Sequence, residues 1–173
     1  TFTNKAGGIF SYTYDHKNQL LTETLPVTAP NASNVQTAVV NAYEYDARGN
    51  KTKTTEAVGL PEQRVTTFTY DKLDRVSSRS GEAMSVYVVA TGGAGTSTAS
   101  FAPTETRTYD GRGNLIEVKD PSGARTLSYY DALNRKIAEV SPTGTLTKWV
   151  YNAAGDQTTQ QIFGDAVALP ATA

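Results

Sequence analysis

The sequence predicts an all-β fold: an array of antiparallel β-hairpins that forms one curved, continuous sheet across residues 1–173. Three observations lead to this expectation: a repeated turn motif, the type of residue that closes each turn, and a composition typical of strands. Thr and Tyr are abundant, and no segment repeats apolar residues at spacings of three and four, so no long helix is expected.

Six copies of one dipeptide, a tyrosine followed by Asp or Asn, mark the turns. They are Tyr14-Asp15, Tyr45-Asp46, Tyr70-Asp71, Tyr109-Asp110, Tyr130-Asp131 and Tyr151-Asn152. A side-chain oxygen at this first turn position can accept a hydrogen bond from the backbone N–H two residues on. Each motif therefore predicts a strand, a tight turn and a return strand, and we call these the Tyr-Asp turns.

The residue that closes each Tyr-Asp turn, three positions after the Asp or Asn, is always Gly, Asn or Asp. These closing residues are Asn18, Gly49, Asp74, Gly113, Asn134 and Gly155. Gly, Asn and Asp are the residue types that most readily adopt the left-handed conformation. We therefore expect positive φ at all six positions.

The turns also alternate in sequence. Residues 46–50 and 110–114 read Asp-x-Arg-Gly-Asn, whereas 71–75 and 131–135 read Asp-x-Leu-Asp/Asn-Arg. This alternation resembles the YD repeat of the Rhs family, which includes bacterial Rhs proteins, the C subunits of insecticidal toxin complexes and, more distantly, teneurins. The resemblance covers residues 12–163, with insertions. It implies a wall segment of a secreted or cell-surface bacterial protein that encloses or displays a cargo such as a toxin.

Spacing divides the array into regular and irregular parts. Tyr109, Tyr130 and Tyr151 follow one another at 21-residue steps, and a second turn with Pro at its second place and Gly at its fourth recurs at 120–123 and 141–144. Earlier steps are longer. We expect a single array of about six repeats over residues 1–173, with loop insertions near 25–40, 57–64 and 81–105 on the rim opposite the Tyr-Asp turns. Within the last insertion, Ser85–Val89 is apolar enough to form an extra strand.

Aromatic residues two positions apart precede four of the turns, so both members of a pair should share one face of the sheet. The pairs are Tyr12/Tyr14, Tyr43/Tyr45, Phe68/Tyr70 and Trp149/Tyr151. We expect the six turn tyrosines to be mostly buried and to contact the equivalent ring of an adjacent hairpin. Outward-facing Tyr and Trp that stack on sugars would instead indicate a carbohydrate-binding or adhesive surface module, the alternative function.

Residues that could carry chemistry are few. The single histidine, His16, lies in the first turn without a nucleophile motif, and the glycine-rich residues 92–97 lack the lysine of a phosphate-binding loop. The turn aspartates each have a turn to close, which favours a structural role over a calcium ladder. Asn31-Ala32-Ser33 matches a glycosylation acceptor, a pattern common by chance. We expect no enzyme activity, no cofactor and no metal, and take the repeat-motif residues as the candidate functional set.

Asp120-Pro121-Ser122-Gly123 is similar to the Asp-Pro-x-Gly motifs at which Rhs proteins cleave themselves. Another Tyr-Tyr-Asp unit follows it within the array, and Ser141-Pro142-Thr143-Gly144 is its counterpart one repeat later. We therefore predict an ordinary repeat turn here.

Charge and termini limit the partners. A net charge of −1 excludes a basic footprint for nucleic acid, no apolar run is long enough to span a membrane, and the chain has no cysteine. Neither flank offers a polar cap for the edge of a sheet. We expect both edges to be continued, by further repeats of the same long chain or by neighbouring copies.

Overall fold

The computed structural model describes residues 1–4, 8–26, 38–89 and 96–170, which contain fifteen β-strands and no helix. All the strand pairs within each unit are antiparallel, so the predicted all-β hairpin architecture is confirmed. The described part of the chain accordingly holds no helix that could cross a membrane. The chain divides into two compact units, Thr1–Ala102 and Pro103–Ala173, and each is considered by itself.

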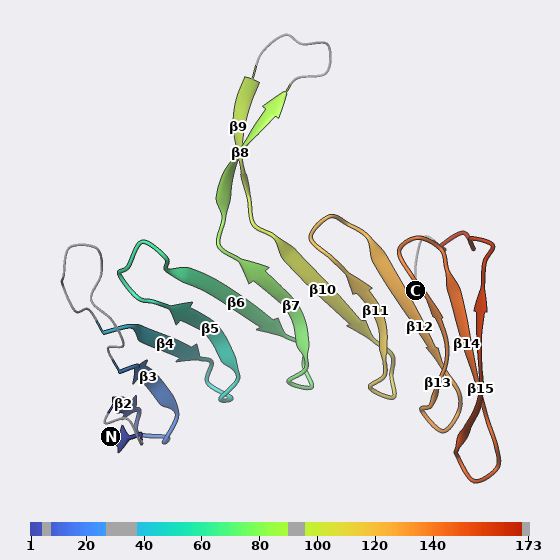
Figure 1. Ribbon diagram of the computed structural model, residues 1–173, viewed down its shortest axis with the longest axis horizontal. Helices are drawn as coiled ribbons and strands as arrows, with labels where there is room; N and C mark the ends of the chain where they lie inside the picture. The colour runs from blue at the N-terminus through green and yellow to red at the C-terminus, as the bar shows by residue number, and fades with distance from the viewer. Residues whose placement is uncertain (5–7, 27–37, 90–95, 171–173) are drawn as a thin grey trace. The chain divides into compact units, whose positions relative to one another are not determined.

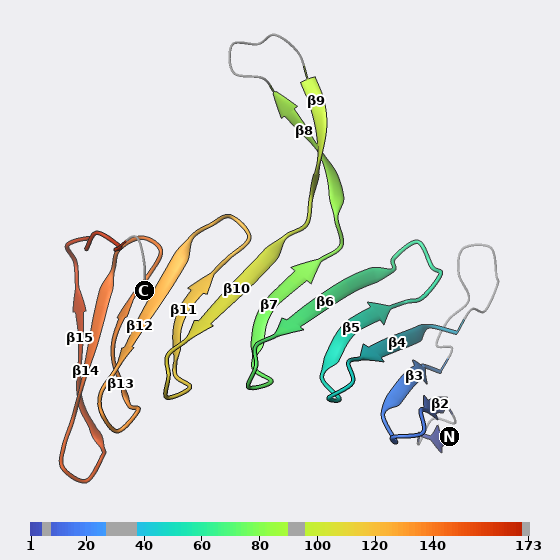
Figure 2. The same ribbon diagram turned by 180° about the vertical axis from the view of Figure 1, so that it is seen from behind.

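The first unit is a row of hairpins in which strand order follows chain order from β1 to β7 (Figure 1). Tyr-Asp turns join β2 to β3, β4 to β5 and β6 to β7. The bounds are β1 Phe2–Thr3, β2 Ile9–Tyr14, β3 Leu20–Thr24, β4 Val40–Tyr45, β5 Lys51–Glu56, β6 Arg64–Tyr70 and β7 Val76–Gly81. No helix or second sheet covers these strands on either side within the described residues (Figure 2).

The long insertion after β7 contains a hairpin of its own. The expected extra strand is present as β8, Met84–Val89, and a second strand that the sequence analysis missed, β9, Thr96–Phe101, pairs with it from Met84↔Phe101 to Val89↔Thr96. β9 is rich in Ser and Thr and lacks a strong apolar pattern, so its strand conformation depends on β8. The glycine-rich residues 92–95 between them lie outside the described residues.

The expected insertion at 57–64 is a folded connection of residues 57–63 between β5 and β6. The N–H of Val58 donates to the carbonyl of Val40 at 2.8 Å, and the N–H of Ala57 donates to Oδ1 of Asn41 at 3.2 Å. These bonds hold the connection against the start of β4 and leave Ala57 only 7% exposed. Of the expected 25–40 insertion, residues 27–37 lie outside the described residues.

The second unit repeats the arrangement with regular spacing, again with strand order following chain order. Tyr-Asp turns join β10 to β11, β12 to β13 and β14 to β15. The bounds are β10 Thr104–Tyr109, β11 Leu115–Lys119, β12 Arg125–Tyr130, β13 Lys136–Val140, β14 Leu146–Tyr151 and β15 Gln157–Phe163. Turns at Asp120–Gly123 and Ser141–Gly144 form the opposite rim, with φ of 89° at Gly123 and 85° at Gly144.

The second unit also has a small core. Leu127 is 1% exposed and Val140 is 5% exposed, and the two lie opposite each other in the β12–β13 register. After β15 the chain returns to the opposite rim, where the N–H of Val167 donates to the carbonyl of Gly144 at 2.8 Å and Arg125 donates to the carbonyl of Pro170. We call Gly164–Pro170 the C-terminal segment. These contacts attach it to the turn that follows Val140 and to the first residue of β12.

Candidate functional site: the rim of Tyr-Asp turns

The first residue of each Tyr-Asp turn organises the turn through one side-chain oxygen. Oδ1 of Asp46 accepts the backbone N–H of Arg48 and of Asn50, both at 2.9 Å. Asp15, Asp71, Asp110 and Asp131 make the same pair of bonds at 2.8–3.1 Å. The repeated geometry explains why Asp recurs at this position: its carboxylate satisfies two N–H groups that the turn leaves unpaired.

All six closing residues have positive φ, as predicted from residue type alone. The angles are 62° at Asn18, 98° at Gly49, 59° at Asp74, 94° at Gly113, 60° at Asn134 and 95° at Gly155. In each turn the N–H of the closing residue donates to the carbonyl of the turn's first residue, as in Gly49 to Asp46 at 3.1 Å. The left-handed residue then returns the chain into the second strand.

Each Tyr-Asp hairpin also carries a β-bulge, which the sequence analysis did not predict. Thr13 pairs with Thr22 but Tyr14 pairs with Leu20, so the return strand contains one extra residue, Leu21. The same shift occurs immediately before the turn tyrosine in all six hairpins. The extra residues are Leu21, Thr52, Ser77, Ile116, Ile137 and Thr158. A bulge at every turn increases the local strand twist, and its repetition gives each hairpin the same bend.

Hydrogen bonding within the turns lowers the pKa of several aspartates below the ordinary value. The pKa of Asp46 is lowered mainly by the backbone N–H of Asn50, and that of Asp131 mainly by the backbone N–H of Arg135. The pKa values of Asp71, Asp110 and Asp120 are lowered first by the side chains of Arg75, Asn114 and Ser122, respectively. In each case the donor favours the ionised carboxylate.

The turn tyrosine fastens its hairpin to the preceding one. The hydroxyl of Tyr45 donates to the carbonyl of Leu20 at 2.9 Å, and Leu20 is the first residue of the preceding return strand. Equivalent bonds join Tyr70 to Lys51 at 2.7 Å, Tyr130 to Leu115 at 3.1 Å and Tyr151 to Lys136 at 2.8 Å. We call this contact the tyrosine clasp. It joins the start of the return strand of one hairpin, just after its turn, to the end of the first strand of the following hairpin, just before the next turn.

The tyrosine clasp replaces the predicted ladder of stacked rings. Four clasp rings, those of Tyr45, Tyr70, Tyr130 and Tyr151, are partly buried, but Tyr14 is 53% exposed, so the prediction of burial is wrong for the first hairpin. The close ring pair found in the described residues is Phe2 with Phe10, at 5.9 Å between centroids, and it involves no turn tyrosine. The strand register between neighbouring hairpins places each of these rings beside the backbone of the preceding return strand, where its hydroxyl donates to a carbonyl.

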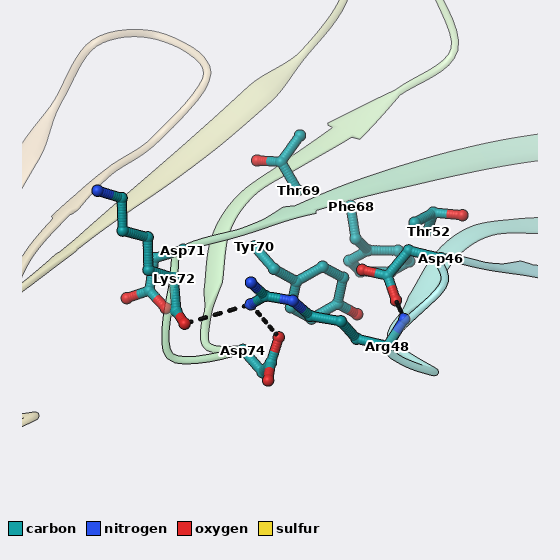
Figure 3. Close-up of a pocket in the computed structure, with 9 residues that line it drawn as sticks. All are labelled: Asp46, Arg48, Thr52, Phe68, Thr69, Tyr70, Asp71, Lys72 and Asp74. Carbon is teal, nitrogen blue, oxygen red and sulfur yellow. Dashed lines mark hydrogen bonds and ion pairs between the residues drawn. The ribbon is translucent and has the colours of Figure 1, made fainter.

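Side chains at the third and fifth turn positions add a second link along the rim, and Figure 3 shows the contacts of the third-position side chain, Arg48. Nη1 of Arg48 donates to the carbonyl of Lys72 at 3.2 Å and lies 3.1 Å from Oδ1 of Asp74. Nδ2 of Asn50 donates to the same Asp74 oxygen at 2.8 Å. These donors lower the pKa of Asp74, with Asn50 the larger cause.

The second unit repeats this link with other residues. Nη1 of Arg112 donates to the carbonyl of Ala132 at 3.3 Å, and Nδ2 of Asn114 donates to Oδ1 of Asn134 at 2.9 Å. The alternating turn sequences therefore have a physical meaning. An Asn at the fifth position of one turn meets an Asp or Asn, and not a Gly, at the closing position of the next.

The rim has grooves between turns, but within the described residues no acid, base or nucleophile side chains come together in them as a catalytic site would require. The groove in Figure 3 has a volume of about 430 Å³ and is lined by Asp46, Phe68, Tyr70 and Asp74, among others. Its carboxylates already accept hydrogen bonds from the turns. His16 is exposed, and no three His, Cys, Asp or Glu residues gather to hold a metal within the described ranges. The geometry suits attachment between hairpins.

Two further sequence candidates have definite outcomes. Asp120-Pro121-Ser122-Gly123 is a repeat turn as predicted, since Asp120 accepts the N–H groups of Ser122 and Ala124 at 2.8 and 2.9 Å. Asn31-Ala32-Ser33 lies outside the described residues. Sequence reasoning missed the tyrosine clasp because its acceptor is a backbone carbonyl, which has no residue signature; the constant place of Tyr before each turn was the available signal.

Comparison with known proteins points to one family. Residues 109–145 match the model of the RHS repeat family. No curated relative matches the chain. Among solved structures, a TcdB2-TccC3-Cdc42 crystal structure is similar over 94% of this chain at 14% identity with a TM-score of 0.66. A TcdB2-TccC3 crystal structure is similar over 91% at 13% identity with a TM-score of 0.64. The chain spans 8% of the length of each of those chains.

Proposed function

Because residues 109–145 match the RHS repeat model and the whole fold resembles TcdB2-TccC3 chains, we propose that the chain is a structural wall segment of a much larger Rhs-type protein. In this proposal residues 1–173 form one array of repeats, and the parent is a bacterial protein that is secreted or held at the cell surface. The wall encloses or displays a cargo such as a toxin domain. Its partners are further repeats of the same chain or neighbouring copies.

The tyrosine clasp is the observation that carries the proposal. In both units these turn tyrosines bond to the preceding hairpin in the row, and within the described residues they do not converge on a common cleft. A repeat whose recurring side chains fasten it to its neighbours distributes stability along the array. A wall needs this property, whereas an enzyme needs convergent acid, base or nucleophile groups.

The fold comparison supports the proposal at the level of architecture. The similar chains come from TcdB2-TccC3 structures, and this chain corresponds to a small part of each. The small share of their length agrees with a segment that depends on many further repeats. A non-catalytic role follows from the proposal, since the segment's task is to hold its neighbours in place.

The experiment locates the segment within the parent protein. An epitope inserted into the 57–63 connection, which lies on the rim opposite the Tyr-Asp turns, is bound by an antibody fragment and imaged by electron microscopy. We expect the fragment on the wall of a hollow particle. A fragment on a separate projecting module, together with sugar binding that is lost in Tyr129→Ala, would overturn the wall and favour an adhesive module; Tyr129 is 44% exposed.

A further inference from the structure

The two faces of the sheet in the first unit differ in composition. Residues that lie opposite each other in an antiparallel pair point to the same face, so the registers from β2 to β7 assign each paired side chain to one face. We call the face that carries the turn tyrosines the tyrosine face. The other face carries most of the serines and threonines, and we call it the hydroxyl face. Figure 3 shows the two faces of β6, with Thr69 on one side of the strand and Phe68 and Tyr70 on the other.

The hydroxyl face has no aromatic side chain in strands β2–β7. Its serines and threonines are Ser11, Thr13, Thr22, Thr24, Thr55, Thr67, Thr69, Ser78 and Ser80, and its aliphatic residues are Ile9, Val40, Ala42 and Val65. Several hydroxyls bond to one another across strands, as Thr13 does with Thr22 at 2.6 Å between their Oγ1 atoms. The ionisable residues of this face in these strands, Glu44 and Lys53, lie opposite each other and form an ion pair at 2.8 Å. The face therefore presents no net charge.

The tyrosine face carries the rings and most of the charges. Its aromatic residues are Phe10, Tyr12, Tyr14, Tyr43, Tyr45, Phe68 and Tyr70. Glu56, Arg64 and Arg79 lie exposed on the same face, and Nζ of Lys51 lies 4.3 Å from the centroid of the Tyr43 ring. Interspersed charges of both signs are typical of a surface in contact with bulk water.

Strand propensity does not explain this division. Threonine favours strands on either face of a sheet, yet here it is concentrated on one. The side chains that anchor binding partners are chiefly Trp, Tyr and Arg, whereas Ser, Thr and Val are under-represented among them. A polypeptide that lies against the hydroxyl face therefore finds neither a ring nor an unpaired charge to hold it. Such a surface suits contact with a chain that stays mobile.

We propose that the hydroxyl face of the first unit is turned toward the enclosed polypeptide cargo and the tyrosine face toward the surrounding water. The inference rests on the proposed function, because only an enclosing wall has an inner and an outer side. It adds which face is the inner one and the kind of contact made there: many weak, exchangeable contacts without a fixed docking site.

The assignment is limited to the first unit. On the corresponding face of the second unit, opposite to its turn tyrosines, lie the cationic side chains of Arg125 and Lys148. Arg125 also bonds there to the carbonyl of Pro170 in the C-terminal segment. That face therefore lacks the neutral, hydroxyl-covered character on which the inference depends.

Cysteine labelling of the intact parent protein tests the assignment. Residues 1–173 contain no cysteine, so an introduced cysteine within them is identified by mass spectrometry of its peptide. Thr67 and Arg79 form a matched pair: both are exposed, and they lie on adjacent strands at nearly the same level, because Thr67 is opposite Ser80. Their side chains lie on opposite faces.

The two variants should respond differently to reagent size. We expect Thr67→Cys to react with a small maleimide but not with a maleimide attached to a large polymer, unless the protein is denatured. Arg79→Cys should react with both reagents in the intact particle. Electron microscopy verifies assembly of each variant, and Thr69→Cys with Arg64→Cys is a second pair for the same comparison.

The outcomes separate the inference from the wall proposal. The reverse pattern, or protection of both positions from the polymer reagent, would overturn the assignment of faces and leave the wall proposal standing. Reaction of both positions with the polymer reagent in the intact particle would overturn the wall proposal as well, since neither face would then be enclosed.

Photo-crosslinking identifies what lies against each face. An aliphatic diazirine side chain in place of Thr67 should crosslink to many sites along the enclosed chain with comparable yields. The same side chain in place of Arg79 should give no crosslink to the cargo. One dominant crosslink from position 67 would show a fixed docking site and contradict the mobile contact.

Discussion

The two compact units build their Tyr-Asp rims alike and their opposite rims differently. Both use an aspartate that binds two N–H groups, a left-handed closing residue, a β-bulge and a tyrosine clasp. On the opposite rim, the second unit has short Pro-Gly turns and the C-terminal segment, whereas the first has the longer 57–63 connection. The side chains that are nearly excluded from solvent, Leu127 and Val140, belong to the second unit.

This difference shows that the repeated hairpin structure can form without a core of large buried apolar side chains. In the first unit the described residue with the least exposure is Ala57, a small side chain in a connection. The row is nevertheless continuous, because polar contacts recur at every turn and each strand pairs with the next. Burial of apolar side chains then adds stability locally, near the opposite rim of the second unit. Substitutions in the two units separate these contributions.

Loss of the core side chain should have the largest effect. We expect Leu127→Ala to lower the free energy of unfolding by about 2–5 kcal/mol, because the residue is 1% exposed and its removal leaves a cavity. Leu21→Ala in the first unit, at a position 37% exposed, should cost about 1 kcal/mol or less. Urea unfolding of both variants measures the difference. Equal costs would show that the two units do not differ in burial.

The C-terminal segment should account for the next largest effect. Gly144 and Gly123 close equivalent turns with positive φ, so an added Cβ strains both. Only at Gly144 would that Cβ lie 2.8 Å from a backbone oxygen, that of Val167; at Gly123 the nearest atom is 3.7 Å away. We expect Gly144→Ala to cost about 1–3 kcal/mol more than Gly123→Ala in thermal or urea unfolding. Identical costs would place the C-terminal segment away from this turn.

A smaller effect is expected for a single tyrosine clasp. Tyr130→Phe removes the hydroxyl that donates to the Leu115 carbonyl and should lower the free energy of unfolding by about 0.5–1.5 kcal/mol. Tyr70→Phe in the first unit, which breaks the bond to Lys51, should cost the same. Tyr129→Phe serves as the control. If the clasp stabilised only one unit, the rims would not be equivalent.

The turn aspartates predict a loss of stability in acid that is shared by both units. Each folded pKa lies below the ordinary value of 3.8, so the stabilisation is present above that pH and is lost as pH falls through the folded values. The affected residues are Asp46, Asp71 and Asp74 in the first unit and Asp110, Asp120 and Asp131 in the second. The urea concentration at half-unfolding, measured between pH 7 and pH 2.5, should decrease once the pH is below about 4.

One natural turn supplies the control for this pH dependence. Asn152 takes the place of the aspartate, and its Oδ1 accepts the N–H of Asp156 at 2.9 Å. Asp131→Asn should therefore keep the turn while making the acid dependence shallower. An unchanged acid dependence would show that Asp131 does not contribute to it.

Sequence reasoning succeeded where one residue type decides a local geometry. Positive φ at Asp74 and Asn134 followed from the restricted set of residues that tolerate it, and the hairpins followed from the turns. It failed where the burial or hydrogen bonding of a residue depends on a partner far away in the sequence. Leu127 and Leu133 are the same residue type six positions apart, yet they are 1% and 71% exposed because one lies in a paired strand and the other in a turn. The acceptor of each clasp is likewise a backbone atom in another hairpin.

The central claim is that each hairpin is fastened to the preceding one through its turn tyrosine. Residue-resolved amide hydrogen exchange of Tyr130→Phe, compared with Tyr129→Phe, tests it most directly. The account predicts faster exchange concentrated in β11 and β12, the strands that the Tyr130 clasp joins, with β2–β7 unchanged. Exchange that is the same in the two variants, or that rises equally across the whole chain, would contradict the claim.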